Sequence, residues 1–186
     1  MKKAASIFLQ PEIRMRDMDN LLRWLKNETV TQYMNESNTV SDEIRSVMKN
    51  VPDYLWRCQL NRHGCFFLIC DDTARSIGFV RCVPLSGSVY EIVFAIGEAS
   101  LWGNGYGAAA VSKAVAHLFL ELRATQVVAK IYHGNTRSKH TVRHCGFMEA
   151  ECGEKLSVFS LTLEQYLKKM HDSDASCEDD RIVAYG

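Results

Sequence analysis

Three glycines occupy alternate positions in the segment LWGNGYGAAA, at residues 103, 105 and 107. Apolar residues then recur at helical spacing from Val111 to Leu122, which predicts a helix over about residues 106–123. Glycine loses much backbone entropy on folding, so three before a helix indicate positive φ or a close ligand. A strand, a glycine-rich turn and a helix N-terminus together can bind a phosphate. The alternative is a tight turn that binds nothing.

Two familiar phosphate-binding loops do not fit this segment. A Walker loop requires Gly-Lys-Ser or Gly-Lys-Thr, and neither tripeptide follows the glycines. The dinucleotide fingerprint Gly-x-Gly-x-x-Gly differs in spacing from glycines that alternate throughout. It also requires the first strand of a parallel sheet, whereas the strand before this loop ends an antiparallel meander. The ligand is therefore a pyrophosphate-bearing molecule of another kind, or the loop binds nothing.

The middle of the chain predicts that antiparallel meander. CFFLIC, SIGFVRCV and SVYEIVFAI are short β-rich runs, and the turn-forming segments DDTAR and PLSGS separate them. After the central helix, QVVAKIY predicts a strand, NTRSKHTVRHC a helix that Gly146 ends, and KLSVFSLTL a last strand. The predicted fold class is therefore α/β, with a mixed α+β sheet in a single domain.

Two helices are predicted before the meander. Asp17 is expected to be the N-cap of the first, whose apolar face runs from Met18 to Leu25. Ser41, followed by two acidic residues, marks the start of the second. The polar stretch between them, VTQYMNESNTV, is predicted to be a loop with no more than a short helical turn.

Length and charge limit the possible functions. The chain of 186 residues suits one domain, which we place at residues 1–170. Residues 171–186 are acidic and polar and lack periodicity, so they are predicted to form a flexible tail. Lys and Arg number 22, as do Asp and Glu, so the net charge is zero with histidine neutral. That balance argues against nucleic-acid or anionic-membrane binding as the main function.

Membrane and metal sites are not predicted either. No apolar run is long enough to cross a bilayer, and the short apolar segment after the N-terminal lysines does not make a signal peptide. The seven cysteines are irregularly spaced and form no Cys-x-x-Cys pair, so no zinc ribbon or thioredoxin-type site is expected. His63 and Cys65 lie near Cys58, but this spacing alone is weak support for a metal. Thiols among apolar neighbours favour a reducing, cytoplasmic location.

Two motifs carry a resemblance to a known family. The first is the run from Trp102 to Gly107, and the second is Asn135-x-x-Ser138 followed by Cys-Gly-Phe at residues 145–147. Together they resemble the Arg/Gln-x-x-Gly-x-Gly/Ala and Asn-x-x-Ser…Gly-Phe motifs of the GCN5-related N-acetyltransferases (GNAT), which bind acetyl-CoA. The opening FLQPEIRMRDMDNLLRWL is similar to the branch of bacterial ribosomal-protein N-terminal acetyltransferases and spermidine acetyltransferases. The resemblance covers about residues 7–163, although Trp102 stands where Arg or Gln is usual.

The resemblance implies acetyl-CoA as co-substrate and direct attack of a primary amine on its thioester, without an acyl-enzyme. The expected amine belongs to a small molecule or is a protein N-terminus. A donor with an acyl group longer than acetyl is the open alternative. The protein is expected to be a monomer or a homodimer. The residues expected to contact acetyl-CoA are Phe94, Ala95, Ile96, Trp102, Gly103, Asn104, Gly105, Tyr106, Gly107, Ala108, Asn135 and Ser138.

Glu91 is the best candidate for the base that deprotonates the amine. It is the single charged residue of SVYEIVFAI and shares a strand face with Val93 and Ala95. Many members of the family that the chain resembles carry a catalytic Glu on this strand. The alternative is a surface-facing Glu on a half-exposed strand, and Glu98 is the second choice as base.

The chain departs from the family pattern at the residue that is expected to protonate the leaving thiolate. Val142 stands seven residues after Asn135, at the position where many members carry Tyr. The resemblance makes Ser138 the catalytic candidate, with water as the alternative. Asn135 contacts the pantetheine arm, caps the following helix, or does both.

Trp24, Tyr33 and Asn38 are the candidates for binding the acceptor, because the N-terminal helices and loop usually wall the amine pocket in this fold. Aromatic rings can stack on a cation or a peptide, while Trp24 can equally pack on the sheet. His133 either lines the cleft or lies at the surface. Two other functions stay open: a non-catalytic CoA-binding or sensing module, and an α/β interaction protein whose glycines form only a turn.

Overall fold

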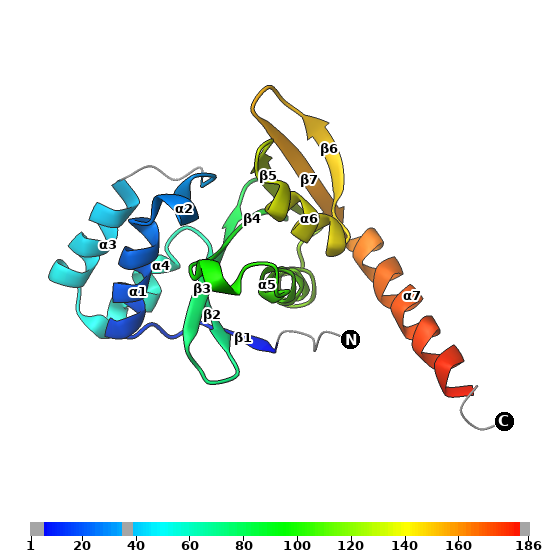
Figure 1. Cartoon of the computed structure of the whole chain (residues 1–186), viewed down its shortest axis with the longest axis horizontal. Coiled ribbons are helices and arrows are strands. Elements are labelled where there is room, and N and C mark those ends of the chain that lie inside the picture. The colour runs from blue at the N-terminus through cyan, green and yellow to red at the C-terminus, as the bar shows by residue number, and fades with distance from the viewer. Residues whose placement is uncertain (1–5, 35–38, 183–186) are drawn as a thin grey trace.

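The computed structural model describes residues 6–34 and 39–182, and a seven-stranded sheet runs through it (Figure 1). The strands lie in the order β1-β2-β3-β4-β5-β7-β6. Only β4 and β5 are parallel neighbours, so the sheet is mixed and the predicted α/β fold class is confirmed. The strands are β1 (Ile7–Gln10), β2 (Cys65–Asp71), β3 (Ser76–Pro84), β4 (Val89–Ile96), β5 (Gln126–Tyr132), β6 (Met148–Cys152) and β7 (Leu156–Thr162).

Helices cover both faces of the sheet (Figure 1). On one face lie α1 (Met15–Leu25), α2 (Glu28–Thr31), α3 (Thr39–Asn50) and α4 (Trp56–Leu60). On the other lie α5 (Tyr106–Ala116), which continues as a π-helical turn (His117–Glu121), and α6 (Thr136–His144). The last helix, α7 (Leu163–Ile182), projects away from the sheet. Short 3-10 turns (Asp53–Leu55 and Ala99–Leu101) complete the chain.

The predicted meander is confirmed, since β2, β3 and β4 pair antiparallel in chain order. The predicted strands β5 and β7 and the helices α1, α3, α5 and α6 are also present. Gly146 follows α6 with a φ of +100°, as expected for a glycine that ends a helix.

The N-cap prediction for Asp17 is wrong. Helix α1 begins at Met15, one turn earlier than expected, and Arg14 is its cap residue. The Asp17 carboxylate, buried in the first turn, accepts a hydrogen bond from the Arg14 backbone N–H at 3.0 Å. An acidic group suits this position because the first turn leaves N–H groups without helical partners.

The segment after residue 170 also differs from the prediction. The sequence predicted no regular structure there, whereas α7 continues without a break to Ile182. The helix contains neither Gly nor Pro, the residues that most strongly end a helix, and polar composition alone does not prevent helix formation. The domain limits at 1–170 and the flexibility of the tail stay predictions.

The two sheet faces carry two separate cores. Alternate β4 side chains Ile92, Phe94 and Ile96 pack in the core beneath α5. Ala95 packs on the opposite side, in the core formed with α1, α3 and α4. Each residue of β4 therefore faces either the α5 side or the N-terminal helices, and this sorts the site residues below.

The end of β4 is tied to α1 through Glu98. Its carboxylate accepts hydrogen bonds from Arg23 at 2.5 Å and from the indole Nε1 of Trp24 at 3.1 Å. The Trp24 ring lies directly on Gly97, where an added Cβ would come within 2.2 Å of it. The bonds from Arg23 and Trp24 hold the pKa of Glu98 below its ordinary value, although burial opposes this. These contacts fix the strand end from which the glycine loop departs.

The substitution Glu98→Gln tests this tie through its pH dependence. A lowered folded-state pKa means that the Glu98 charge stabilises the fold above the unfolded value of about 4.3 and that this stabilisation is lost as the pH falls through the folded value. We expect E98Q to unfold more readily than wild type at pH 7 in urea, with a difference that shrinks toward acid. A difference independent of pH would contradict this. Glu12→Gln, which removes an exposed partner of Arg57, is the control and should change little.

Candidate active site

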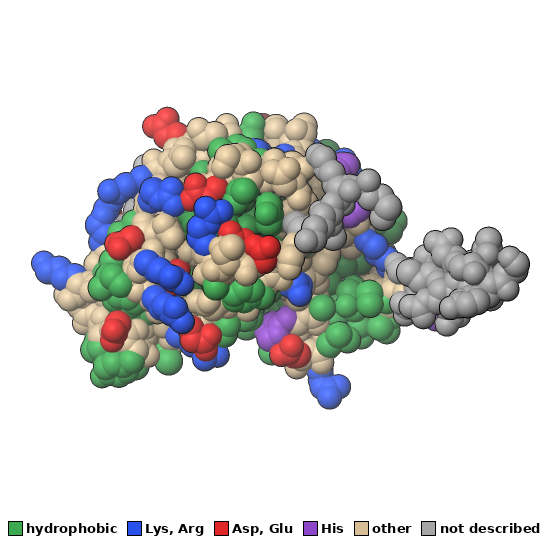
Figure 2. Space-filling view, turned by 60° about the horizontal axis from the view of Figure 1, so that its bottom comes forward, with side chains coloured by type: hydrophobic (Ala, Val, Ile, Leu, Met, Phe, Trp, Pro, Cys, Tyr) green, Lys and Arg blue, Asp and Glu red, His purple; other side chains and the backbone are tan. Residues whose placement is uncertain are grey.

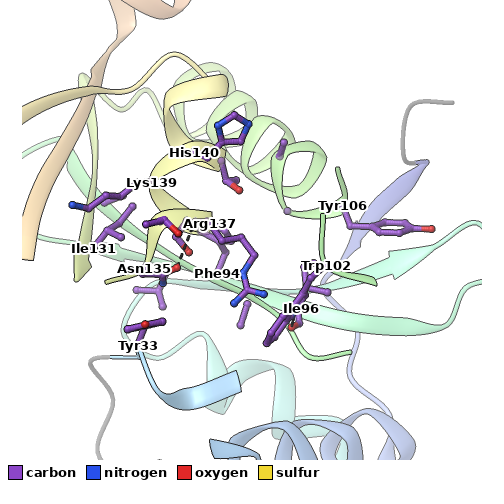
Figure 3. Close-up of a pocket in the computed structure, with 18 of the residues that line it drawn as sticks. Tyr33, Phe94, Ile96, Trp102, Tyr106, Ile131, Asn135, Arg137, Lys139 and His140 are labelled. Carbon is purple, nitrogen blue, oxygen red and sulfur yellow. Dashed lines mark hydrogen bonds between the residues drawn. The ribbon is translucent and has the colours of Figure 1, made fainter. Parts of the chain in front are cut away.

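A cavity of about 850 Å³ opens where β4 and β5 separate (Figure 3). The two strands pair only from Val89–Gln126 to Glu91–Val128. Beyond that point β4 residues 92–96 and β5 residues 129–131 line the cavity. The remaining walls are the glycine loop with the first turn of α5, helix α6, and Thr29, Val30, Tyr33 and Met34 from α2 and the residues after it.

Two of the three glycines are required by the backbone. Gly103 has a φ of +77° and Gly105, the cap residue of α5, has a φ of +84°. Residues with a side chain rarely adopt such angles. The loop therefore turns sharply into α5, and the first residues of this helix, whose N–H groups lack helical acceptors, line the cavity. This arrangement favours the binding of an anion in the cavity.

Gly107 is a glycine for another reason. Its φ is not positive, and a Cβ built on it would meet only Phe94 and Thr141 at 3.7 Å, an ordinary contact distance. Neither the backbone nor the packing of the chain requires glycine at this position. Gly107 lines the cavity, so the missing side chain leaves room there for something other than the protein.

Asn135 and Ser138 lie together at the start of α6. The Asn135 side chain accepts a hydrogen bond from the Ser138 backbone N–H at 3.1 Å, which confirms its role as the helix cap. Both residues line the cavity, as shown for Asn135 in Figure 3. The contact of Asn135 with pantetheine and the catalytic role of Ser138 stay predictions.

Glu91 lies where the pairing of β4 and β5 ends. Its carboxylate accepts a hydrogen bond from Lys130 Nζ at 2.7 Å, and its side chain is 15% exposed. Lys130, on β5, lines the cavity, whereas Glu91 is held behind it and is not among the described lining residues. Glu91 shares a strand face with Val93 and Ala95, as the sequence predicted, and the structure places this face opposite α5. Its carboxylate is thus one side chain away from the cavity.

The structure separates the three acceptor candidates. Tyr33 lines the cavity. Its hydroxyl packs close to Gly134, 3.1 Å from the point where a side chain at that position would place its Cβ. Trp24 is 1% exposed and hydrogen-bonded to Glu98, so of its two interpretations the structure favours packing on the sheet. Asn38 lies outside the described residues.

All of the residues predicted to contact acetyl-CoA line the cavity except Asn104, which is exposed. Tyr106 lines it at one end, with its ring pointing away from Phe94 (Figure 3).

Two other residues named from the sequence lie away from the cavity. Val142, whose side chain has no acidic proton, is fully buried in the core beneath α5. His133 is exposed, with Nε2 2.9 Å from the Gly153 carbonyl oxygen, and is not among the described lining residues.

Two cavity residues were missed by the reasoning from the sequence. The Arg137 guanidinium lies 3.5 Å from the centroid of the Trp102 ring and reaches it across the cavity (Figure 3). Lys130 is the partner of Glu91 described above. Each had a signal: Arg137 lies inside the Asn-x-x-Ser motif, and Lys130 is the only charged residue in QVVAKIY.

Several other features were checked over residues 6–34 and 39–182. They contain no group of three His, Cys, Asp or Glu side chains that could hold a metal ion, and no helix long and apolar enough to cross a membrane. The cysteines with described side chains are free thiols. Positive and negative side chains are interspersed over the face in Figure 2, as the zero net charge suggests.

Comparison with known proteins identifies the family. The sequence profile of the acetyltransferase (GNAT) domain matches residues 7–148. An uncharacterized N-acetyltransferase of Bacillus licheniformis is 25% identical over 139 residues, which cover 74% of this chain and 77% of that protein. The chain belongs to the GNAT family and is an N-acetyltransferase enzyme.

Solved structures share the fold. Spermidine N-acetyltransferase from Vibrio cholerae, in complex with CoA and spermine, superposes with a TM-score of 0.68 at 18% identity, covering 87% of this chain and 98% of that one. An aminoglycoside acetyltransferase in complex with coenzyme A superposes with a TM-score of 0.70 at 15% identity, covering 88% and 98%. At such low identity these likenesses concern the fold alone.

Gly107→Ala separates folding from ligand binding. Because the chain itself tolerates a Cβ here, and alanine is the better helix former, the thermal midpoint should stay level or rise slightly. Because the methyl group enters the cavity, the affinity for acetyl-CoA should fall about tenfold or more. Differential scanning fluorimetry and calorimetric titration measure the two effects. Gly97→Ala, which would collide with Trp24, is the contrasting variant and should mainly destabilise the fold. Full acetyl-CoA affinity in G107A would refute this account of the glycine.

Proposed function

We propose that the protein transfers the acetyl group of acetyl-CoA directly to a primary amine. The observation that carries the proposal is one cavity that joins the N-terminus of α5 to the opened edge of β4. The first end suits a pyrophosphate, and the second suits an extended chain that contains amides. The complexes of two structural relatives with CoA support the choice of co-substrate.

The strand edge has the chemistry to bind the pantetheine arm. Past Glu91, β4 still pairs with β3 on one side. On the β5 side, the part of the chain that the structure describes provides no strand that pairs with it. Backbone N–H and C=O groups at such an edge need partners, and the amides of an extended ligand can supply them. Pantetheine placed there leaves its thioester near the point where the strands meet, beside Lys130 and Glu91.

We infer that Glu91 is the base and that Lys130 assists it. An ammonium ion next to the positive charge of Lys130 loses its proton more readily, because like charges disfavour the charged form. Glu91, bonded to Lys130 at 2.7 Å, can then accept that proton directly or through a water molecule. Ser138 is proposed to protonate the leaving thiolate, with water as the alternative.

The lining favours an acceptor without several positive charges. Its charged side chains among the described residues are all basic: Lys130, Arg137, Lys139 and Arg143. A polyamine or aminoglycoside would find no carboxylate among the described lining residues to pair with its several ammonium groups. We therefore place the α-amine of an amino acid or a protein N-terminus ahead of polycations. The α-amine of a protein N-terminus has an ordinary pKa of about 7.7–8.0, so a fraction of it is already free base near neutral pH. Tyr33 is the proposed acceptor contact. A cytoplasmic location and a monomeric or homodimeric state stay predictions.

An amine panel tests the function. The melting temperature is measured with acetyl-CoA and with CoA, and free thiol is then followed with amino acids, short peptides, spermidine and kanamycin. Thiol release that depends on an amine supports the transferase. A thermal shift without thiol release from any amine would favour a binding or sensing module. No thermal shift with acetyl-CoA or CoA would favour an interaction protein whose glycines form only a turn.

Glu91→Gln tests the proposed base. The amide keeps the size of the side chain but cannot take a proton, so kcat at pH 7 should fall by about a hundredfold or more. The dissociation constant of acetyl-CoA should change by less than about threefold, because Glu91 does not line the described cavity. The deficit should shrink as the pH approaches the pKa of the amine, where free base is already present.

Stopped-flow thiol release and calorimetry measure the two effects of Glu91→Gln. Glu121→Gln, which removes an exposed partner of His117, is the matched control and should keep the wild-type rate. An unchanged rate for E91Q at pH 7 would remove Glu91 as the base.

A further inference from the structure

The glycine loop lacks a cationic side chain of its own. The segment LWGNGYGAAA contains no Lys or Arg, so the loop offers an anion only backbone N–H groups and the α5 dipole. A helix N-terminus is equivalent to roughly half a positive charge, less than the charge of a pyrophosphate. A full cation from elsewhere in the chain would complete the site.

Arg137 is the cation in the best position. Its guanidinium lies over the Trp102 ring at 3.5 Å, and Trp102 is the residue next to Gly103. The ring is held in turn by the hydrogen bond from its Nε1 to the Ile96 carbonyl oxygen at 2.8 Å. The guanidinium carbon lies over the ring, and the planar guanidinium carries five N–H donors, so donors that do not face the ring can bind an anion.

The other basic side chains of the lining are engaged or directed elsewhere. Lys130 binds Glu91 at 2.7 Å and Arg143 binds Glu149 at 2.8 Å. Lys139 approaches His133 Nδ1 at 3.4 Å, and in Figure 3 it lies on the side of the cavity away from Trp102. Within residues 6–34 and 39–182, Arg137 forms no ion pair with a carboxylate. Arg137 is an exposed residue, and although partial burial of its guanidinium lowers its pKa, its placement beside Trp102 is what makes it the candidate.

We propose that Arg137, held on the Trp102 ring, binds the pyrophosphate of acetyl-CoA together with the glycine loop. Arg137 is then a cofactor-binding residue delivered from α6, and Trp102 is a positioning residue that aims it. The pairing joins the two walls of the cavity, since Trp102 leads into α5 and Arg137 lies in the first turn of α6. This inference rests on the proposed use of acetyl-CoA.

The test compares three acyl donors on wild type and Arg137→Ala. Removal of a charge-assisted hydrogen bond should raise the dissociation constant of acetyl-CoA by about 10- to 100-fold. The same factor is expected for 3′-dephospho-acetyl-CoA, which keeps the pyrophosphate. S-acetylpantetheine, which lacks it, should bind both proteins equally. Arg137→Lys should recover part of the loss, because it keeps the charge without the planar stack. Arg57→Ala, which removes an exposed charge on α4, controls for net charge.

The role of Trp102 is tested by a double-mutant cycle. If Trp102 acts through Arg137, Trp102→Leu should weaken acetyl-CoA binding, and adding it to Arg137→Ala should cause little further loss. Trp102→Phe loses the hydrogen bond to the Ile96 carbonyl oxygen but keeps an aromatic face for Arg137. Its affinity for acetyl-CoA should therefore be closer to that of wild type than the affinity of Trp102→Leu. Fluorescence gives a second readout, because Trp24 and Trp56 are each 1% exposed and acrylamide should quench mainly Trp102. Acetyl-CoA should protect Trp102 from this quenching in wild type and less so in R137A.

The outcomes distinguish this inference from the proposed function. Wild-type protein that does not bind acetyl-CoA would refute the function itself. Tight binding by wild type and R137A alike would overturn only the role of Arg137. An equal loss with S-acetylpantetheine would mean that Arg137 shapes the cavity, and a loss seen only with the 3′-phosphorylated donor would assign Arg137 to that phosphate. Either result would overturn the pyrophosphate contact.

Discussion

The separation of β4 from β5 is the constraint on which the site depends. These strands pair over Val89–Glu91 and Gln126–Val128 and then diverge, although each keeps its other neighbour. Unpaired strand groups in the middle of a sheet are unfavourable, at about 1–3 kcal/mol for each buried group left without a partner. A fold that keeps such an opening needs something to satisfy those groups, and the cavity between the strands has room for a ligand. The opening is therefore better understood as part of a binding site than as a packing defect.

The two helical layers contribute different chemistry to this opening. From the α5 side come a helix N-terminus, two glycines with positive φ, and the first turn of α6 with Asn135 and Arg137. From the opposite side come Tyr33 and the pair of Lys130 and Glu91. A thioester at the narrow end of the opening would be accessible from both sides. In the proposed reaction, the phosphorylated donor would bind on the α5 side and the acceptor would approach from the opposite side.

Sequence reasoning succeeded where the local backbone dictates the residue type. Positive φ at Gly103 and Gly105 and the cap at Asn135 are local requirements, so their pattern could be recognised without a structure. The strand periods of the meander were equally clear. The short edge strand β1 and the fully exposed β6 were not predicted, because four residues or a run without a buried face carry little periodic signal.

Contacts between distant parts of the chain were not predictable. Lys130 and Glu91 are 39 residues apart, and their bond exists only because two non-consecutive strands become neighbours. The burial of Trp24 depends likewise on Gly97 and Glu98 at the end of β4. An amphipathic pattern shows that one helix face is buried but does not show which of its residues reaches a cavity.

The arrangement of charge explains why relatives with the same fold are a weak guide to the acceptor. The chain is neutral overall, yet the described charged side chains of the cavity wall are all basic, and carboxylates such as Glu91 and Glu149 hold two of them from behind. A polycation is favoured by carboxylates in the wall itself, since a desolvated ammonium ion needs a partner of opposite charge. The fold places a cavity between β4 and β5, but the side chains at a few lining positions determine the electrostatic potential inside it. Identities of 15% and 18% leave those positions free to differ, so the shared sheet by itself does not define the acceptor.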